Sequence, residues 1–245
     1  MSAANKASKQ DPQTQTVGMT GMQRMASKMW APWIVMGLMI VVVSFVMGLI
    51  LQATEASYFS NSKEVREAAV AGSAIVQDRG FIEVTKAWVP GFKFFGLGLM
   101  LGGITFLLAT ILGNLRVQGG RVQQALGVPV VIPEPPRTAK MFPMFMMLGM
   151  MILMAALVIS IWLATVAASY WNHSIATELN PAAAGSELLR QLGLLNAVKA
   201  WLVPFKFIGM ASLFAGIALA LVTIVKVLQI QTVRMIEVVS AAKKQ

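Results

Sequence analysis

Side chains that could do catalytic or metal chemistry are sparse in this sequence of 245 residues. It has no cysteine and a single histidine, His173, so it lacks a thiolate nucleophile, a Cys-ligated metal site and a second histidine for a catalytic pair. Its few carboxylates stand beside basic residues, as Glu187 does with Arg190, which is typical of solvated helices. We therefore expect no enzymatic activity, no catalytic residues, no metal site and no cofactor.

Two lysines recur in the same local sequence. Lys93 and Lys206 each lie between two phenylalanines, and each follows a tryptophan, Trp88 or Trp201. Lysine and tryptophan are both favoured where a membrane meets water, because an apolar stem or ring carries a polar end. We expect all four residues at the interface, with the lysines reaching lipid headgroups. An anion site formed twice is the alternative.

Methionines cluster in two places. Met144, Met147 and Met151 share one face of an expected helix, and thioethers can bind Cu(I). Flexible apolar packing against lipid or another subunit is the more common role of such side chains. We expect packing, with copper handling as a lesser possibility. The two clusters consist of Met19, Met22, Met25 and Met29, and of Met141, Met144, Met146, Met147, Met150, Met151 and Met154.

The composition indicates which elements position these residues. Of the chain, 57% is hydrophobic and only 12% is charged, against about 25% charged in soluble domains. Four stretches without charge are long enough to cross a bilayer, which takes about 20 apolar residues. They predict transmembrane helices near residues 31–51, 94–115, 142–169 and 207–225. The expected fold is all-α, a polytopic membrane protein.

The sequence also repeats itself. The pattern KAW, then FKF and a glycine, occupies residues 86–96 and recurs 113 residues later at 199–209. The triplet ASY at 56–58 recurs 112 residues later at 168–170. These matches predict a tandem duplication of a two-helix unit. Because each unit would cross the membrane twice, the two copies should have the same orientation, as in parallel repeats.

The duplication suggests four parts of the chain. We expect a disordered or amphipathic N-terminal segment (1–27), a first repeat unit (28–126), a proline-rich linker (127–139) and a second repeat unit (140–245). Each unit should hold two transmembrane helices with a loop between them. Each loop should contain a short helix, beginning at Asn61 in the first loop and at Asn180-Pro181 in the second.

Basic residues indicate the orientation in the membrane. Twelve of the 20 lysines and arginines fall on the side that holds both termini and the linker, and eight fall in the loops. By the positive-inside rule, both termini should be cytoplasmic in a multi-pass protein of the cell membrane. The basic charge is spread over three segments without interleaved aromatic residues, so a nucleic-acid partner is not expected.

Small residues recur at helix-packing spacing. Gly98 and Gly102 lie four residues apart in the second span, and Ala211 and Ala215, followed by Gly216, repeat that spacing in the fourth. Such residues let helix backbones approach closely in lipid. We expect them where the second and fourth helices meet each other or a partner. Gly149 is expected to be less constrained.

These features favour a non-enzymatic accessory or scaffolding subunit of a larger membrane protein complex. Its partners would be membrane lipids and either other membrane protein subunits or further copies of the chain. The alternative is a small oligomeric transporter or channel, lined weakly by hydroxyl groups of the spans. The candidate lining residues are Thr105, Thr110, Thr165, Ser212 and Thr223.

Overall fold

The computed structural model describes residues 21–125 and 136–242, and within these residues it is all-helical, without strands. Most of the expected N-terminal segment, residues 1–20, lies outside the described residues, as do residues 126–135 of the linker. The expectation of an all-α chain is therefore confirmed for the described part.

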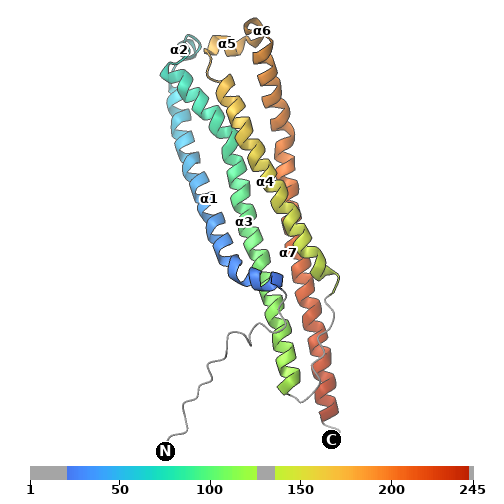
Figure 1. Cartoon of the computed structure of the whole chain (residues 1–245). Helices are drawn as coiled ribbons and strands as arrows, with labels where there is room; N and C mark the ends of the chain where they lie inside the picture. Colours follow the sequence, from blue (N-terminus) through green and yellow to red (C-terminus); the bar gives the residue numbers. More distant parts are fainter. Residues whose placement is uncertain (1–20, 126–135, 243–245) are drawn as a thin grey trace, which may run out of the picture. The chain divides into compact units, whose positions relative to one another are not determined.

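Four long helices dominate the described residues (Figure 1). They are α1 (Gly21–Ser60), α3 (Ala74–Ala125), α4 (Thr138–Tyr170) and α7 (Ser186–Ala242). Each is long and apolar enough to cross a membrane, and each contains one of the four spans expected from the sequence. The chain therefore has the architecture of a multi-pass membrane protein. Since an α-helix rises about 1.5 Å per residue, α3 and α7 are much longer than a bilayer core of about 30 Å requires.

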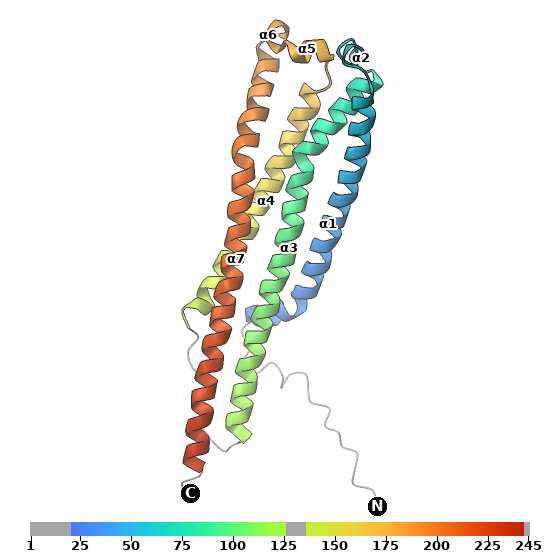
Figure 2. The ribbon, with the colours of Figure 1, turned by 180° about the vertical axis from the view of Figure 1, so that it is seen from behind.

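Three short helices complete the description. They are α2 (Lys63–Glu67) between α1 and α3, and α5 (Ile175–Leu179) and α6 (Pro181–Ala184) between α4 and α7. Helix α5 contacts both α2 and α6. Figures 1 and 2, from opposite sides, both show these three helices gathered together. The two loops predicted to hold short helices thus do so.

The contacts divide the chain into two compact units, and each takes a part of all four long helices. The loop unit comprises residues 33–102 and 145–214 and includes α2, α5 and α6. The termini unit comprises residues 1–32, 103–144 and 215–245. This is a different division from the two repeat units expected from the sequence, because it cuts across the helices.

In the loop unit, helices cross where glycines remove the side chain. A Cβ placed on Gly37 of α1 would lie 2.6 Å from the carbonyl oxygen of Gly96 on α3. A Cβ placed on Gly149 of α4 would lie 2.8 Å from the carbonyl oxygen of Gly209 on α7. At both crossings the two backbones are in contact, which only glycine permits.

The loop unit buries an apolar core between α3, α4 and α7, with Leu163, Tyr170, Leu195 and Leu202 among its fully covered side chains. Helix α1 is covered least: 11% of the residues in its most apolar stretch are buried, against 44% in α3. Large apolar side chains such as Phe45, which is 66% exposed, therefore face outward along α1.

In the termini unit, α3, α4 and α7 pack around Leu112, Phe142 and Val227. Two hydrogen bonds join these helices. The side-chain amide of Gln231 donates to the carbonyl oxygen of Leu115 at 2.7 Å, and the hydroxyl groups of Thr223 and Thr138 are 2.8 Å apart. Polar side chains thus align the ends of the helices within this unit.

Candidate functional site

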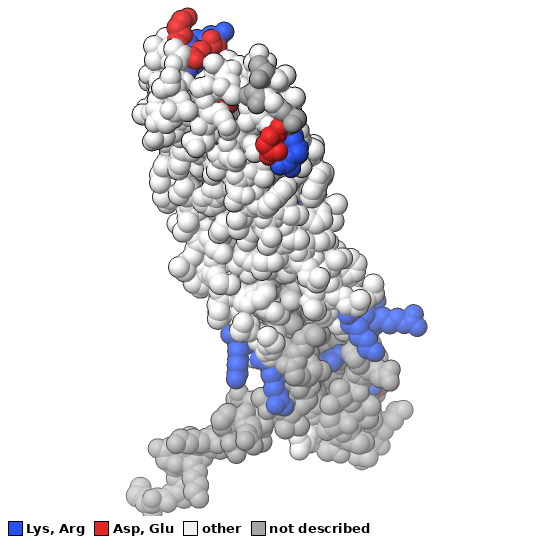
Figure 3. Space-filling model, turned by 45° about the horizontal axis from the view of Figure 1, so that its top comes forward, with Lys and Arg blue, Asp and Glu red and all other residues white. Residues whose placement is uncertain are grey.

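Charged side chains of the loop unit gather beside the short helices, where Figure 3 shows acidic and basic side chains above a broad band of uncharged atoms. Ion pairs connect them across helices. Lys86 on α3 pairs with Glu55 on α1, and Lys199 on α7 lies 3.6 Å from Glu83 on α3. We call this group the polar cap; its members are Glu55, Arg79, Glu83, Lys86, Glu178 and Lys199.

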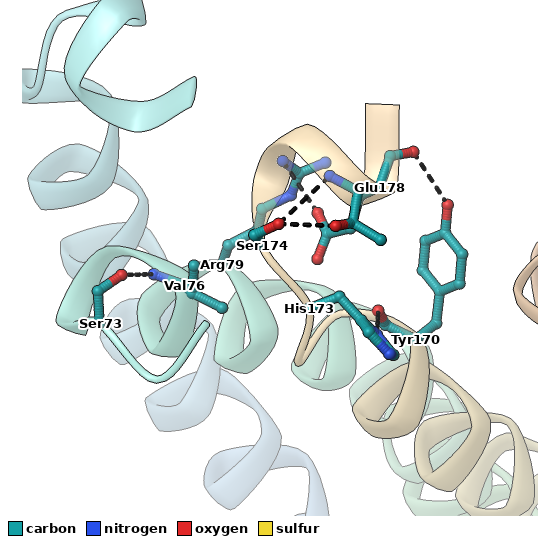
Figure 4. A network of polar contacts seen from close by, with 8 residues as sticks. Ser73, Val76, Arg79, Tyr170, His173, Ser174 and Glu178 are labelled. Atoms are coloured by element: carbon teal, nitrogen blue, oxygen red, sulfur yellow. Dashed lines mark hydrogen bonds and ion pairs between the residues drawn. The ribbon is translucent and has the colours of Figure 1, made fainter. Parts of the chain in front are cut away.

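The most buried contact of the polar cap joins α3 to α5. Nη1 of Arg79 lies 3.1 Å from Oε2 of Glu178, whose side chain is 0% exposed. The guanidinium group of Arg79 also stacks on the indole of Trp171, with its Cζ 4.6 Å from the ring centroid. Figure 4 shows Arg79 reaching from α3 toward the carboxyl group of Glu178. Arg79 thus links α5 to the residue that follows α4.

Local sequence explains why Glu178 lies there. Ser174 caps α5, since its hydroxyl accepts a hydrogen bond from the backbone N–H of Thr177 at 3.3 Å. The hydroxyl of Tyr170 donates to the carbonyl oxygen of Glu178 at 3.3 Å (Figure 4). Ile175 packs with Val76 and Ile82 of α3 in a small apolar cluster. Together these contacts place α5 over the end of α4 with Glu178 facing inward.

The environment of Glu178 disfavours its charge. Burial raises the pKa of this carboxyl group to about 7; the positive charge of Arg79 opposes that rise, and the negative charge of Glu83 adds to it. Neither carboxyl oxygen accepts a hydrogen bond within the described residues. Because the folded pKa exceeds the ordinary value of 4.5, the stability from Glu178 is fully present below pH 4.5 and is lost as the pH rises through about 7.

The two repeated lysines differ in the structure. Lys93 is exposed, but Lys206 is only 3% exposed, so the expectation that both reach outward is not met for Lys206. The reason is its place on α7, where Leu202 and Leu213, also buried, lie on the same helical face. Lys206 therefore points into the loop unit.

The two interfacial tryptophans are arranged alike. Trp201 is 45% exposed and Trp88 is half-buried. Each ring meets a phenylalanine four residues later edge to face, Trp88 with Phe92 at 5.1 Å and Trp201 with Phe205 at 5.7 Å between centroids. Their positions suit the membrane interface expected from the sequence, although no membrane surrounds the chain here.

The small residues expected at helix contacts also divide. A Cβ on Gly98 would clash with Leu153 of α4, and one on Gly102 would lie 3.0 Å from the indole of Trp33 on α1. Ala211 is exposed, Ala215 is half-buried and Gly216 is buried. The glycines of α3 thus lie at contacts with other helices. Ala211 meets no helix of its own chain.

The expectation that Gly149 is less constrained is wrong. A Cβ on Gly149 would lie 2.7 Å from Cγ of Leu213 and 2.8 Å from the carbonyl oxygen of Gly209. The misjudgement arose because the second neighbour, on α7, is distant in sequence. Gly149 is one of the tightest positions in the loop unit.

The sequence analysis did not single out Arg79, Glu83 or Glu178. Arg79 and Glu178 are 99 residues apart, and neither stands in a recognisable motif. The one local signal was the hydroxyl of Ser174, placed to begin a short helix that carries Glu178. The pairing itself depends on how α5 folds back onto α3, which no local pattern encodes.

Metal chemistry finds no set of ligands in the part of the chain that the structure describes. No group of three or more His, Cys, Asp or Glu side chains is placed to hold an ion there. Met144, Met147 and Met151 are 69%, 59% and 67% exposed, so this face of α4 points outward. Comparisons of the chain with protein-family models, with curated proteins and with solved structures found no match. Function is therefore argued from the residues themselves.

Proposed function

We propose that the chain is a non-enzymatic accessory or scaffolding subunit of a larger membrane protein complex. One observation carries this proposal: the hydroxyl groups of the spans donate to carbonyl oxygens of their own helices. Ser44 bonds to Ile40 at 2.8 Å, Ser160 to Ala156 at 2.8 Å and Thr223 to Leu219 at 2.7 Å. In lipid such bonds satisfy the polar groups internally, so these groups serve the fold and not a substrate.

The outward surface suits membrane lipids and helices of other subunits. Large apolar side chains cover one side of α1 and one face of α4, with Phe45 66% and Met151 67% exposed. Lipid alone can cover such faces. A partner helix can cover them equally well, because association in lipid depends on close packing and not on hiding apolar surface from water.

The alternative is a small oligomeric transporter or channel lined by hydroxyl groups. Among the candidate lining residues, Thr165 is on an exposed face and donates to the carbonyl oxygen of Trp162 at 2.7 Å, whereas Thr105 and Thr223 are 0% exposed. Residues that face outward and residues buried in the chain do not form one lining. This difference favours the accessory role. Copper handling stays the lesser possibility.

We also infer that the chain is a tandem duplication of a two-helix unit. The two glycine crossings support this inference, since Gly37 and Gly149 are 112 residues apart and Gly96 and Gly209 are 113 apart, matching the sequence repeat. The rings of Phe94 and Phe207, also repeat partners, meet edge to face at 5.3 Å. Contact between equivalent residues is expected close to a pseudo-two-fold axis.

The loops support the same inference. Ser62 caps α2 as Ser174 caps α5, 112 residues later, each accepting a hydrogen bond from the N–H three residues on. Before these caps, the side-chain amide of Asn61 donates to the carbonyl oxygen of Tyr58, and Nδ1–H of His173 donates to that of Tyr170. His173 thus does the structural work that Asn61 does in the first loop, and needs no catalytic role.

The orientation proposed for this subunit places both termini in the cytoplasm and the polar cap outside, in the cell membrane. The excess of basic residues on the side of the termini supports it. The described loops carry both signs of charge in ion pairs, as the polar cap does.

Affinity purification of the tagged, full-length chain from its native membranes in a mild detergent tests the accessory role. We expect at least one other membrane polypeptide to elute in a fixed ratio to the chain, and to do so again in a second detergent. A particle made only of this chain in both detergents would contradict the proposal and favour the channel alternative.

A further inference from the structure

We propose that α5 and its N-terminal cap, residues 174–180, form a pH-dependent latch at the loop end, closed on α3 and α4 when Glu178 is protonated and released as Glu178 ionises. This latch does not depend on the accessory role proposed above. It adds a regulated element to a surface that would face the outside of the cell.

The latch is held by a small number of contacts. Ile175 is 3% exposed and packs with Tyr58, Val76 and Ile82. Tyr170 holds the carbonyl oxygen of Glu178, and Arg79 pairs with its carboxyl group. Leu179, at the end of the same helix, is 62% exposed. A five-residue helix with so few anchors can open locally without unfolding the long helices.

Glu178 is the group in this latch whose charge is set against its surroundings. Its side chain is wholly buried, and neither carboxyl oxygen accepts a hydrogen bond within the described residues. Arg79 offers one ion pair at 3.1 Å, and that guanidinium group is shared with the ring of Trp171. A buried carboxylate with so little support is more stable when neutral.

The other titratable and charged groups around the latch are accounted for as follows. Helix α3 presents Glu83, whose negative charge opposes ionisation of Glu178. Lys199 of α7 and Lys86 of α3 pair with Glu83 and draw its charge away from Glu178. Tyr170 precedes the latch, and His173 adjoins it with its ring on the carbonyl oxygen of Tyr170. Helix α2, which contacts α5, contributes Lys63, Glu64, Arg66 and Glu67.

The direction of the response follows from linkage. Glu178 has a pKa of about 7 in the closed latch and an ordinary value of 4.5 when exposed. The open form is therefore favoured increasingly as the pH rises from 4.5 to about 7. Since each unit of pKa difference corresponds to a tenfold change, the open-to-closed ratio should rise by roughly two orders of magnitude across this range.

Cysteine labelling measures this ratio directly, because the natural chain has no cysteine. Ile175→Cys places a thiol that is buried when the latch is closed, and Leu179→Cys places a matched thiol that is always exposed on the same helix. The two variants are labelled with a maleimide in detergent from pH 5 to pH 8. Dividing the first rate by the second cancels the pH dependence of thiol reactivity.

We expect the ratio of rates to rise at least tenfold between pH 5 and pH 8, and to become independent of pH when Glu178→Gln is added. A ratio that does not change with pH would overturn the latch. So would a rise that persists in the Glu178→Gln background. If Ile175→Cys disturbs folding, hydrogen exchange of the amides of residues 175–179 in the otherwise natural chain, corrected for intrinsic rates, answers the same question.

Neighbouring variants test the assignment to Glu178. Removing the negative charge with Glu83→Gln should lower the midpoint pH of opening, and removing the ion-pair partner with Arg79→Gln should raise it. His173→Asn, which installs the residue found at the equivalent place in the first loop, should leave the midpoint unchanged. Midpoints that move in the opposite directions, or that move with His173, would also overturn the latch.

Discussion

At the scale of single residues, Lys93 and Lys206 show that one motif can have two fates. Their sequence surroundings are nearly the same, yet Lys93 is exposed and Lys206 is 3% exposed. The motif correctly predicts lysines beside aromatic rings near the ends of spans. It does not predict which lysine faces the interior, because that depends on which side of each helix the other helices cover.

A buried ammonium group is costly unless it is paired, and no acidic side chain within the described residues pairs with Lys206. Replacing it by methionine, which keeps the length of the side chain, should raise the stability in detergent by about 1–3 kcal/mol. Lys93→Met is the matched control and should change it by less than about 0.5 kcal/mol. The measurement is thermal unfolding of the purified variants. A destabilising Lys206→Met would show that the ammonium group has a stabilising partner.

The pair of Arg79 and Glu178 marks the limit of residue-level prediction. Charged residues in the loops were expected to be solvated, and most are, such as Glu187 with Arg190 at 2.6 Å on an exposed face. Glu178 is the exception, because Ile175 and Tyr170 fold α5 inward. Tertiary packing of three residues on different elements determines its burial.

At the scale of elements, the sequence predicted the four spans well but not the helix ends. Absence of charge marks the membrane core, whereas α3 and α7 continue far beyond it through polar residues that are good helix formers. In the second loop, Asn180-Pro181 begins α6 as expected. In the first loop the cap of α2 is Ser62 and not Asn61, whose amide instead bonds back to α1.

The glycine crossings yield a test of the helix packing and of the duplication together. Gly37→Ala and Gly149→Ala would each place a Cβ under 3 Å from a backbone oxygen of the facing helix, so the helices must separate. We expect each change to lower stability by about 1–3 kcal/mol, the usual range for overpacking, and the two to do so by similar amounts. Thermal unfolding in detergent measures both.

Gly48→Ala is the control for these variants, since a Cβ at Gly48 of α1 would meet nothing within 4 Å. It should leave stability unchanged or raise it by up to about 1 kcal/mol, because alanine is the better helix former. Equal tolerance of alanine at residues 37, 48 and 149 would show that the helices do not cross at these glycines.

The methionine face of α4 has a separate prediction. Met144, Met147 and Met151 are exposed together, and replacing all three by leucine nearly conserves volume. If they pack against lipid or a partner, the triple variant should keep the metal content of the natural chain, measured by elemental analysis after purification. Copper that is near stoichiometric in the natural chain and lost in the triple variant would establish copper handling instead.

At the scale of the whole molecule, the central claim is a membrane protein of four spans whose two loops lie on one side and whose termini and linker lie on the other. Composition and charge-free windows were enough to predict four spans, because the bilayer imposes length and apolarity on each helix separately. They could not predict the division of contacts into two units, which depends on packing between helices.

A topology map tests this claim most directly. Reporters that are active on one side of the membrane can be fused after Gln245 or inserted near Pro133, Gly72 and Gly185. The last two have positive φ and room around them, so insertion there should be tolerated. We predict cytoplasmic readings at Gln245 and Pro133 and external readings at Gly72 and Gly185. An external reading at Pro133 would contradict the four-span arrangement, and with it the two-unit duplication.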